Sequence, residues 1–544
     1  MKGHPHGTAP AIAVPHRTRL PLARRAEQAD GRPPRPAARH RPSAGTVYDA
    51  AALATTVERL ADCLYEAGLR AGDRVVVAKD NHYDMPLLAA GAARIGALPV
   101  MLAPIASVDT VRELIDRAQP SLLVAGTRLL RRAATAGVTL AGPAVRTVAV
   151  GEPVGDLPPG ALTLDDLRGG PRAPVRIGGA DEPMISTHTS GTTGVPKLVL
   201  HTANTAIGRF PARMERCPIP FLTTRHSDVT AAAVSFAHIR VMAWTASQLK
   251  MAPHKVVAIS DPGLATVERM VERHRPTMLE ALPNMFQHWE ALVARRPELF
   301  TQVRLYVTTF DAVHTRTVRT FLDASRRRFP VWGWGLGQSE VTGIIVNLFT
   351  RRTVRAGGAR GDRTNIGWPA ASVRVRVVDP ETGRRQPRGK PGLLMVDTRA
   401  RCLTYLGEDD RYRAKCEGRW WNSGDLGERV GFGRIRLLDR EVDMLPGQSC
   451  IELESILLDR LPNAADVTLL ARPDQPPVPV LCLRDGELDP GEWARATAGL
   501  PELAPPRLVP WEDVPRTATW KVRRLALREQ VLGTAEASGT GKWT

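Results

Sequence analysis

Apolar and polar residues alternate along the chain with two different periods. From residue 47 onward, apolar side chains return every three or four positions, at Leu53, Val57, Leu60, Leu64 and Leu69. This spacing predicts an amphipathic helix. Ala-Gly-Asp at 71–73 then turns the chain into a short apolar run over 74–78, which is typical of a buried parallel strand. The sequence therefore begins its ordered part with a helix–turn–strand unit.

The same alternation continues for about 230 residues. The pattern predicts further helices over 85–95 and 266–275, and strands over 98–102, 122–125, 145–150, 255–259 and 305–307. Helices that alternate with short apolar strands indicate an α/β fold with layered parallel sheets. No internal repeat is evident.

The pattern of predicted helices and strands changes in the last third of the chain. From about Val373, short strands and turns predict a β-rich module, with strands over 373–378, 392–396 and 434–438. After Arg440, a helix over 453–461 and strands over 467–470 and 478–483 predict a small α+β domain. A chain of 544 residues is too long for one core. We therefore expect a disordered basic tail over 1–16, a large domain over 17–438 and a C-terminal domain over 439–544.

The distribution of charge along the chain bears on whether the protein binds nucleic acid. The formal net charge is +18, and residues 1–42 supply +7 of it from eight Arg and one Lys against two acids. The other +11 is spread without a dense run, and aromatic residues make up only 5%. Few aromatic platforms and no basic stripe argue against a nucleic-acid partner.

Cysteines and apolar runs indicate a cytoplasmic chain without a membrane span. The six cysteines form no CxxC pair and no zinc-finger spacing, so we expect free thiols in a reducing compartment. No signal peptide is visible. The longest apolar stretch, over 87–106, is interrupted by Arg94, Pro99 and Pro104, which favours buried elements over a membrane span.

The strongest local motif covers residues 185–197, ISTHTSGTTGVPK. Six of its thirteen residues carry hydroxyls, two are glycines, and it ends on Pro-Lys directly before an apolar strand. A glycine-rich turn exposes backbone N–H groups to an anion, and a lysine adds a point charge for phosphate. A flexible Ser/Gly linker is the alternative, but such linkers rarely end in this way. The spacing of a Walker P-loop is absent.

This motif resembles the signature loop of the acyl-adenylate-forming superfamily, the AMP-binding enzymes that include acyl-CoA synthetases, luciferases and peptide-synthetase adenylation domains. The chain is most similar to the stand-alone acyl-CoA synthetases. The resemblance implies that the loop holds the β- and γ-phosphates of ATP. The residues that match are Thr189, Ser190, Gly191, Thr192, Thr193, Gly194 and Lys197.

Four further motifs follow in the family's order. Residues 336–340 (LGQSE) resemble an element in which Gly337 and Gln338 border the nucleotide, Ser339 contacts the α-phosphate and Glu340 binds Mg²⁺. Residues 421–426 (WNSGDL) imply that Asp425 binds the ribose hydroxyls.

The remaining two motifs lie nearer the C-terminus. Residues 438–440 (LDR) imply that Arg440 reaches ribose or phosphate. Residues 514–524 place Lys521 as the adenylation lysine between the substrate carboxylate and the α-phosphate. Taken singly, Glu340 could be an ordinary loop acid and Arg440 or Lys521 a surface cation. The assignment of these roles depends on all the motifs occurring together in the family's order. The predicted catalytic residues are Lys521, Glu340, Ser339 and Thr189.

The predicted acyl pocket departs from the family pattern. His238, Phe310, Gly335 and Leu336 are its expected lining residues. Leu336 stands where the family has a tyrosine that stacks on adenine, and Phe310 stands where it has a glycine. The larger Phe310 predicts a shortened pocket for a small or planar acid. No acid for an α-ammonium group is evident near Phe236, and Arg240 either meets a second carboxylate or faces solvent.

The second half-reaction also departs from the pattern. The resemblance implies a mobile C-terminal lid that rotates after adenylation. Trp520 replaces the usual glycine before Lys521, and the hinge loop over 441–446 is short, with Val442 in place of a hinge Asp or Lys.

The sequence thus predicts ATP-dependent activation of a small carboxylic acid to an acyl-AMP, with release of pyrophosphate and transfer to coenzyme A. Implied cofactors are ATP and Mg²⁺, with coenzyme A as co-substrate. One alternative acceptor is a carrier-protein thiol, an amine or another nucleophile. A second alternative is a non-catalytic nucleotide-binding protein, and a third is nucleic-acid binding through the basic tail.

Overall fold

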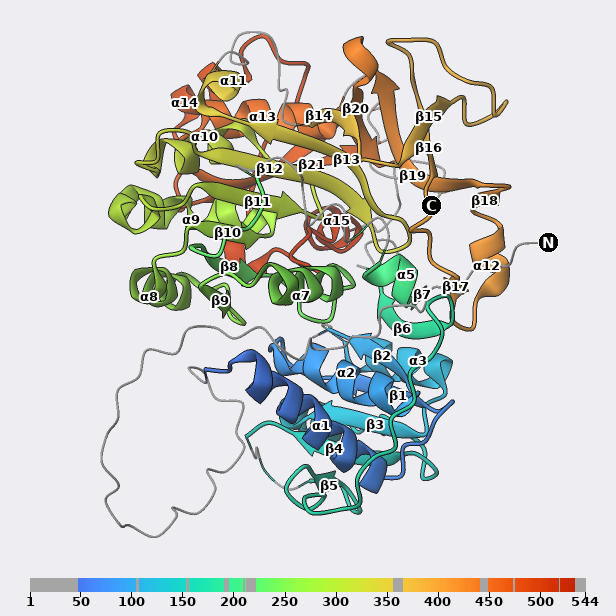
Figure 1. The fold of residues 1–544 in the computed structure, drawn as a ribbon. Helices are drawn as coiled ribbons and strands as arrows, with labels where there is room; N and C mark the ends of the chain where they lie inside the picture. The colour runs from blue at the N-terminus through green and yellow to red at the C-terminus, as the bar shows by residue number, and fades with distance from the viewer. Residues whose placement is uncertain are drawn as a thin grey trace, which may run out of the picture.

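The computed structural model describes residues 47–103, 107–152, 155, 157–189, 195–208, 211, 222–355, 365–440, 449–472, 475–517 and 519–533, with only the backbone of Arg440. The predicted tail over 1–16, the loop residues Ser190 to Gly194 and the hinge over 441–446 lie outside the described residues. The fold is α/β, as predicted, with two large sheets and one small sheet (Figure 1).

The first sheet has eight strands in the order β17-β7-β6-β2-β1-β3-β4-β5. Its strands are β1 (Arg74–Ala78), β2 (Leu98–Leu102), β3 (Leu122–Gly126), β4 (Arg146–Val150), β5 (Leu162–Thr163), β6 (Pro183–His188), β7 (Leu198–Thr202) and β17 (Thr404–Tyr405). Side chains alternate between its faces. Val75 and Val77 pack with helices α1 (Ala50–Glu66) and α2 (Asp84–Ile95), and Val76 packs with α3 (Val108–Ala118) and α4 (Thr127–Thr135) on the other face.

The second sheet has twelve strands and forms the upper part of Figure 1. Its strands are β8 (Val229–Ala233), β9 (Lys255–Ala258), β10 (Met278–Ala281), β11 (Leu305–Thr309), β12 (Val331–Gln338), β13 (Thr342–Phe349), β14 (Ile366–Pro369), β15 (Arg374–Val378), β16 (Pro391–Asp397), β18 (Cys416–Glu417), β19 (Trp420–Arg429) and β20 (Ile435–Arg440). Strands β9, β8, β10, β11 and β12 are parallel, and β13 onward are antiparallel. The predicted β-rich module therefore continues the parallel part through β14, which pairs with β13 and β20.

Helices accompany the second sheet and the strands β7 and β17 of the first sheet. They are α5 (Ala203–Ala206), α7 (Arg240–Met251), α8 (Leu264–His274), α9 (Pro283–Arg295), α10 (Thr315–Ala324), α11 (Arg351–Arg355) and α12 (Asp409–Arg413). The first and second sheets are joined by Asn81, which follows β1. Its side-chain amide donates to the carbonyls of Val234 and Ser260 at 2.9 and 3.0 Å and accepts from the backbone N–H of Phe236 at 2.8 Å.

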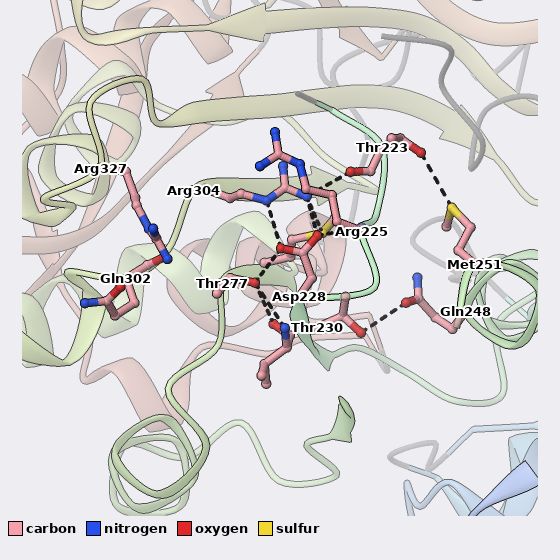
Figure 2. A network of polar contacts seen from close by, with 12 residues as sticks. Thr223, Arg225, Asp228, Thr230, Gln248, Met251, Thr277, Gln302, Arg304 and Arg327 are labelled. Carbon is pink, nitrogen blue, oxygen red and sulfur yellow. Dashed lines mark hydrogen bonds and ion pairs between the residues drawn. The ribbon is translucent and has the colours of Figure 1, made fainter. Parts of the chain in front are cut away.

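A buried ion pair ties together the amino ends of the parallel strands. Asp228, directly before β8, accepts from Arg304 Nε at 2.9 Å and from Thr277 Oγ1 at 2.8 Å, and only 3% of its side chain is exposed. Figure 2 shows Arg304 and Thr277 converging on this carboxylate. Both partners directly precede strands, β11 and β10 respectively, so the pair holds three neighbouring strands in register.

The C-terminal residues build a small sheet with cores of its own. Strands β21 (Ala464–Arg472), β22 (Gln475–Leu483) and β23 (Arg507–Leu508) lie between two sets of helices. Leu469 and Leu481 pack toward α13 (Cys450–Arg460) and α14 (Pro490–Thr497), whereas Leu470 and Val480 pack toward α15 (Arg524–Leu532). The α+β character predicted for this segment is correct.

This C-terminal sheet docks on helices α9 and α10 of the large sheet. Arg316 on α10 donates to the carbonyls of Leu458, Leu461 and Ala464 at 2.6 to 3.1 Å and forms a 3.0 Å ion pair with Glu290 on α9. The docking brings the turn over 517–521 to the carboxyl ends of the parallel strands. In the part of the chain that the structure describes, no helix has both the length and the apolar content to cross a bilayer, and the five described cysteines are free thiols.

Candidate active site

A cavity of about 500 Å³ lies where strands of both large sheets end and the C-terminal sheet docks. Every predicted site residue whose side chain is described borders it. These are Thr189, Lys197, His238, Phe310, Gly335, Leu336, Gly337, Gln338, Ser339, Glu340, Asp425 and Lys521. Sequence positions as far apart as 189 and 521 thus meet around one space.

The segment from Leu336 to Glu340 forms one wall, because β12 ends at Gln338 and turns there into β13. Gln338 donates to the carbonyl of Ser423 at 2.7 Å and to Asp425 Oδ2 at 2.8 Å, and accepts from Trp421 Nε1 at 3.3 Å. Gln338 thereby fixes the Asp425 carboxylate, which is only 4% exposed. The backbone of Arg440 pairs with that of Asp425 across β19 and β20.

Ser339 lies between two buried histidines. His201 Nε2 lies 2.8 Å from the carbonyl of Ser339, and a carbonyl only accepts, so this nitrogen carries the proton. Burial lowers the pKa of His201 to about 4, which keeps the ring neutral at neutral pH. His201 thereby holds the Ser339 backbone in place while remaining uncharged.

His238 faces the Ser339 hydroxyl from the other side. Its Nδ1 accepts from the backbone N–H of Arg240 at 3.1 Å, and its Nε2 lies 3.3 Å from Ser339 Oγ. Burial, with smaller contributions from the charges of His188 and Lys521, lowers the pKa of His238 to about 3. A neutral ring whose Nδ1 accepts must carry its proton on Nε2. His238 therefore directs an N–H toward Ser339 and the cavity.

Glu340 is a buried carboxylate at the cavity wall, 7% exposed. The hydroxyl of Tyr405 on β17 donates to Glu340 Oε1 at 2.7 Å. Burial and the charge of Glu340 raise the pKa of Tyr405 well above its usual range, so the tyrosine stays a donor. Among the described residues, no three His, Cys, Asp or Glu side chains converge on a common point. Glu340 is therefore a single carboxylate, which fits Mg²⁺ shared with phosphate oxygens.

Lys197 and Thr189 border the part of the cavity next to the hydroxyl-rich loop. The backbone N–H of Thr189 donates to the carbonyl of Lys197 at 2.9 Å, and Thr189 Oγ1 accepts from the backbone N–H of Lys197 at 3.0 Å. Burial lowers the pKa of Lys197 to about 8, with the charge of Lys415 acting in the same direction and that of Glu340 opposing it. Five cationic side chains border the cavity: Lys197, Arg240, Arg411, Lys415 and Lys521.

Lys521 reaches the cavity from a tight turn of the C-terminal sheet. The backbone N–H of Thr517 donates to the carbonyl of Lys521 at 2.8 Å, and Thr517 Oγ1 accepts from the Lys521 N–H at 3.2 Å. Arg516, beside the turn, forms a 2.6 Å ion pair with Asp466 on β21. Trp520 has a φ of +57°, a conformation that favours glycine. This geometry explains why the family pattern has glycine there.

Phe310 occupies a second glycine-type position. Its φ is +85°, which is rare for a bulky residue, and its side chain is 7% exposed. The ring meets that of His238 edge to face at 4.5 Å between centroids. The strained aromatic thus fills the space beside His238, which is consistent with the predicted shortening of the pocket.

The sequence did not point to His201, Tyr405 or Glu280, and it left two alternatives open for Arg240. His201 and Tyr405 had no motif around them. Arg240 does not face solvent. It lines the cavity and forms a paired ion contact with Glu280 on β10, with Nε to Oε1 and a terminal nitrogen to Oε2 both at 3.0 Å. Glu280 is an ionisable residue within the otherwise apolar strand MLEA. Such a residue needs a buried partner, so this is the signal from which the ion pair could have been predicted.

Comparison with known proteins identifies the family. The sequence model of the family described as "AMP-binding enzyme" matches residues 26–406. A 3-amino-2-hydroxy-4-methoxybenzoate diazotase from Streptomyces cremeus is 36% identical over 516 residues, covering 90% of this chain and 91% of that protein.

Two solved structures share the fold. An anthranilate CoA ligase in complex with anthranoyl-AMP matches with a TM-score of 0.73 at 20% identity, covering 88% of this chain and 91% of that one. An O-succinylbenzoate coenzyme A synthetase from Bacillus subtilis, in complex with ATP and magnesium, matches with a TM-score of 0.69 at 19% identity, covering 88% and 94%.

Proposed function

The chain belongs to the AMP-binding enzyme family, and we propose on that basis that it adenylates a small oxyanion with MgATP and passes the activated group to an aromatic amine. The observation that supports adenylation is that Lys521, Ser339, Glu340 and Asp425 border one cavity. We further propose that the large domain ends at residue 438 and that the C-terminal domain, from residue 439, rotates between the two half-reactions.

In adenylation, some of these residues would bind ATP and others would offset negative charge. The loop over 189–194 and Lys197 would hold the β- and γ-phosphates, and Asp425, fixed by Gln338, would accept from the ribose hydroxyls. Glu340 would bind Mg²⁺, which offsets phosphate charge when bound. Lys521 would lie between the attacking oxyanion and the α-phosphate, two anions that repel each other. Ser339, with His238 behind it, would donate to the α-phosphate.

The amine acceptor is supported by the diazotase relative. Diazotisation joins an aromatic amine to a nitrogen at the oxidation level of nitrite, an oxyanion that can attack phosphorus as a carboxylate does. A nitrite oxygen would attack the α-phosphorus and release pyrophosphate. The amine nitrogen would then attack the nitrosyl nitrogen, with AMP as leaving group and loss of a proton. Uptake of a proton by the resulting N-nitroso compound and loss of water then give the diazonium ion.

Transfer of an aromatic acyl group to coenzyme A is the second candidate. It is supported by the volume of the cavity, which at about 500 Å³ lies in the range that accepts an aromatic acid. In that reaction the carboxylate of the aromatic substrate would itself face Lys521 and become the adenylate, and a thiol would attack it.

ATP–pyrophosphate exchange separates these candidates. We would measure it with nitrite, with benzoate and aminobenzoates, and with short aliphatic acids, and then add an aromatic amine or coenzyme A. Exchange supported by nitrite, and diazo product on adding the amine, is the expected result. Exchange supported by an aromatic acid, with an acyl-CoA product, would replace the amine acceptor by coenzyme A. No exchange with any oxyanion, while ATP still binds, would overturn adenylation itself.

Replacing Phe310 with glycine should enlarge the range of aromatic substrates. The change removes a strained φ worth about 1–2 kcal/mol and opens space beside His238. We expect kcat/KM for ring-extended substrates, measured relative to a single-ring substrate, to rise about tenfold. Phe432→Gly is the matched control, since Phe432 has a φ of +59° but is 92% exposed. An unchanged substrate range in Phe310→Gly would show that Phe310 does not limit the pocket.

ATP affinity should weaken as the pH rises through 8. Burial lowers the pKa of Lys197 to about 8, so its ammonium is present below that pH and is lost above it. At pH 9 about a tenth of the free enzyme would carry the charge, and the apparent Kd for ATP should rise about tenfold. Equilibrium ATP binding between pH 7 and 9 tests this. Lys197→Arg, whose guanidinium stays charged, should give a flat profile; an equal rise there would assign the effect elsewhere.

A further inference from the structure

The ion pair between Arg240 and Glu280 lies inside the cavity, and the proposed function does not use it. We infer that Arg240, held by Glu280, binds a carboxylate on the aromatic substrate, so that this carboxylate points into the cavity and the reacting amine points toward Lys521. The inference rests on the proposed function, and it names the substrate class as amino-substituted aromatic acids.

The position of Arg240 follows from its place in the chain. It is the first residue of α7, two residues after His238, and its backbone N–H donates to the His238 ring. Glu280 projects from β10, a strand in the parallel part of the sheet. Both residues border the cavity, with side chains 19% and 8% exposed. The pair therefore lies beside His238 in the cavity wall and away from bulk water.

Most of the cavity wall is apolar. Among the residues that border the same space are Trp244, Met278, Leu305 and Val307. An ion pair at such a place loses hydration, and apolar residues of the same size are often at least as stabilising. Stability alone therefore does not account for two charges at this wall, whereas recognition of a charged ligand group does.

Glu280 gives the guanidinium a fixed plane. Two of the five N–H groups of Arg240 go to the two carboxylate oxygens of Glu280, at 3.0 Å each. A planar cation held in this way can meet a second carboxylate with defined geometry. Glu280 also offsets the charge of Arg240, which limits the cost of holding the guanidinium among apolar side chains.

The two candidate functions give the carboxylate of the aromatic substrate different partners in the cavity. A coenzyme A ligase must present the aromatic carboxylate to Lys521, because it is the group to be adenylated. An enzyme that adenylates a separate oxyanion must present the amine there, and the carboxylate then needs a partner elsewhere. Arg240 is a cation at the cavity wall placed to be that partner.

The test compares 3-aminobenzoate with 3-aminobenzamide, which has the same shape without the charge. The assay is pyrophosphate release with nitrite and MgATP at saturation. We expect the natural chain to favour the acid by about 10- to 100-fold in kcat/KM. In Arg240→Gln/Glu280→Gln the preference should fall to within about threefold. The double variant is used because a single one would leave a buried charge unpaired. Equilibrium binding of 3-aminobenzoate should weaken by a similar factor.

The matched control is Asp228→Asn/Arg304→Gln. This pair is also buried and doubly bonded (Figure 2). Neither residue is among the described residues that border the cavity. It should lower the melting temperature and leave the preference for the acid in place. Equal kcat/KM for acid and amide in the natural chain, or a preference that survives in the Arg240/Glu280 variant, would overturn this inference while nitrite-dependent pyrophosphate release still supports the proposed function.

Failure of the proposed function is recognised separately. Pyrophosphate exchange that needs 3-aminobenzoate and no nitrite would mean that the carboxylate faces Lys521, and both proposals would then be wrong. Absence of nitrite-dependent release from the natural chain would overturn the proposed function before any variant is compared.

Discussion

Lys521→Ala should abolish adenylation while the protein still folds and binds ATP. We expect kcat for oxyanion-dependent pyrophosphate release to fall about 100- to 1,000-fold, as when one positioned electrostatic group is removed from a transition state. The affinity for ATP should change by less than about threefold, because the phosphate-binding loop and Lys197 are untouched. Single-turnover pyrophosphate release, together with ATP titration, separates the two quantities.

The fold around Lys521 should tolerate the substitution. The turn is held by the backbone N–H and C=O of residue 521, which bond to Thr517, and alanine keeps both groups. Lys255→Ala removes an exposed lysine from β9 and should leave the rate unchanged. A Lys521→Ala enzyme that released pyrophosphate within tenfold of the natural rate would show that the charge at the α-phosphate comes from another residue.

The sequence predicted the elements of the fold closely, because most of them are short buried strands next to amphipathic helices. The apolar run over 74–78 coincides with β1, and the run over 98–102 with β2. A parallel strand is buried on both faces, so its residues form a continuous apolar run that the sequence displays directly. The β-rich module predicted from about Val373 is present, and the structure adds that β14 joins it to the parallel strands through β13. Strand pairing of this kind depends on partners far along the chain.

The residues of the site also fall into a part that the sequence predicted and a part that it did not. Glycine- and hydroxyl-rich motifs are local, and the described residues taken from them border one cavity. The buried support behind them is not local. Ser339 is held by His201, 138 positions away, and Glu340 by Tyr405, 65 positions away. Single histidines and tyrosines in apolar segments carry no pattern that points to a distant partner, so only the fold reveals them.

Departures from a family pattern proved informative about backbone geometry. Phe310 and Trp520 replace glycines, and both have positive φ, at +85° and +57°. The sequence located these departures, and the structure adds that each residue keeps the conformation that glycine would take at no cost. Strain of about 1–3 kcal/mol at each position is retained next to the cavity, which is where strained residues most often have a function.

Glu340→Gln should raise the Mg²⁺ requirement and slow the reaction by about 100-fold or more, since a bound metal supplies several kcal/mol of charge stabilisation. Glutamine keeps the shape of glutamate and its oxygen can still accept from Tyr405, so the main change is the lost negative charge. That charge also favours the protonated form of Lys197. The variant should therefore lose ATP affinity at a lower pH than the natural chain does. Mg²⁺ titrations of ATP binding and of pyrophosphate release measure both effects.

Tyr405→Phe distinguishes the charge of Glu340 from its orientation. It removes the 2.7 Å hydrogen bond and leaves the carboxylate, so we expect a loss of about two- to tenfold and a nearly normal Mg²⁺ requirement. If Glu340→Gln and Tyr405→Phe gave the same small loss, Glu340 would be a structural acid and the metal would be held by ATP alone. If only Glu340→Gln shifted the Mg²⁺ titration, the carboxylate would be a metal ligand. Because ATP binding is measured beside turnover, this conclusion does not depend on which oxyanion the enzyme activates.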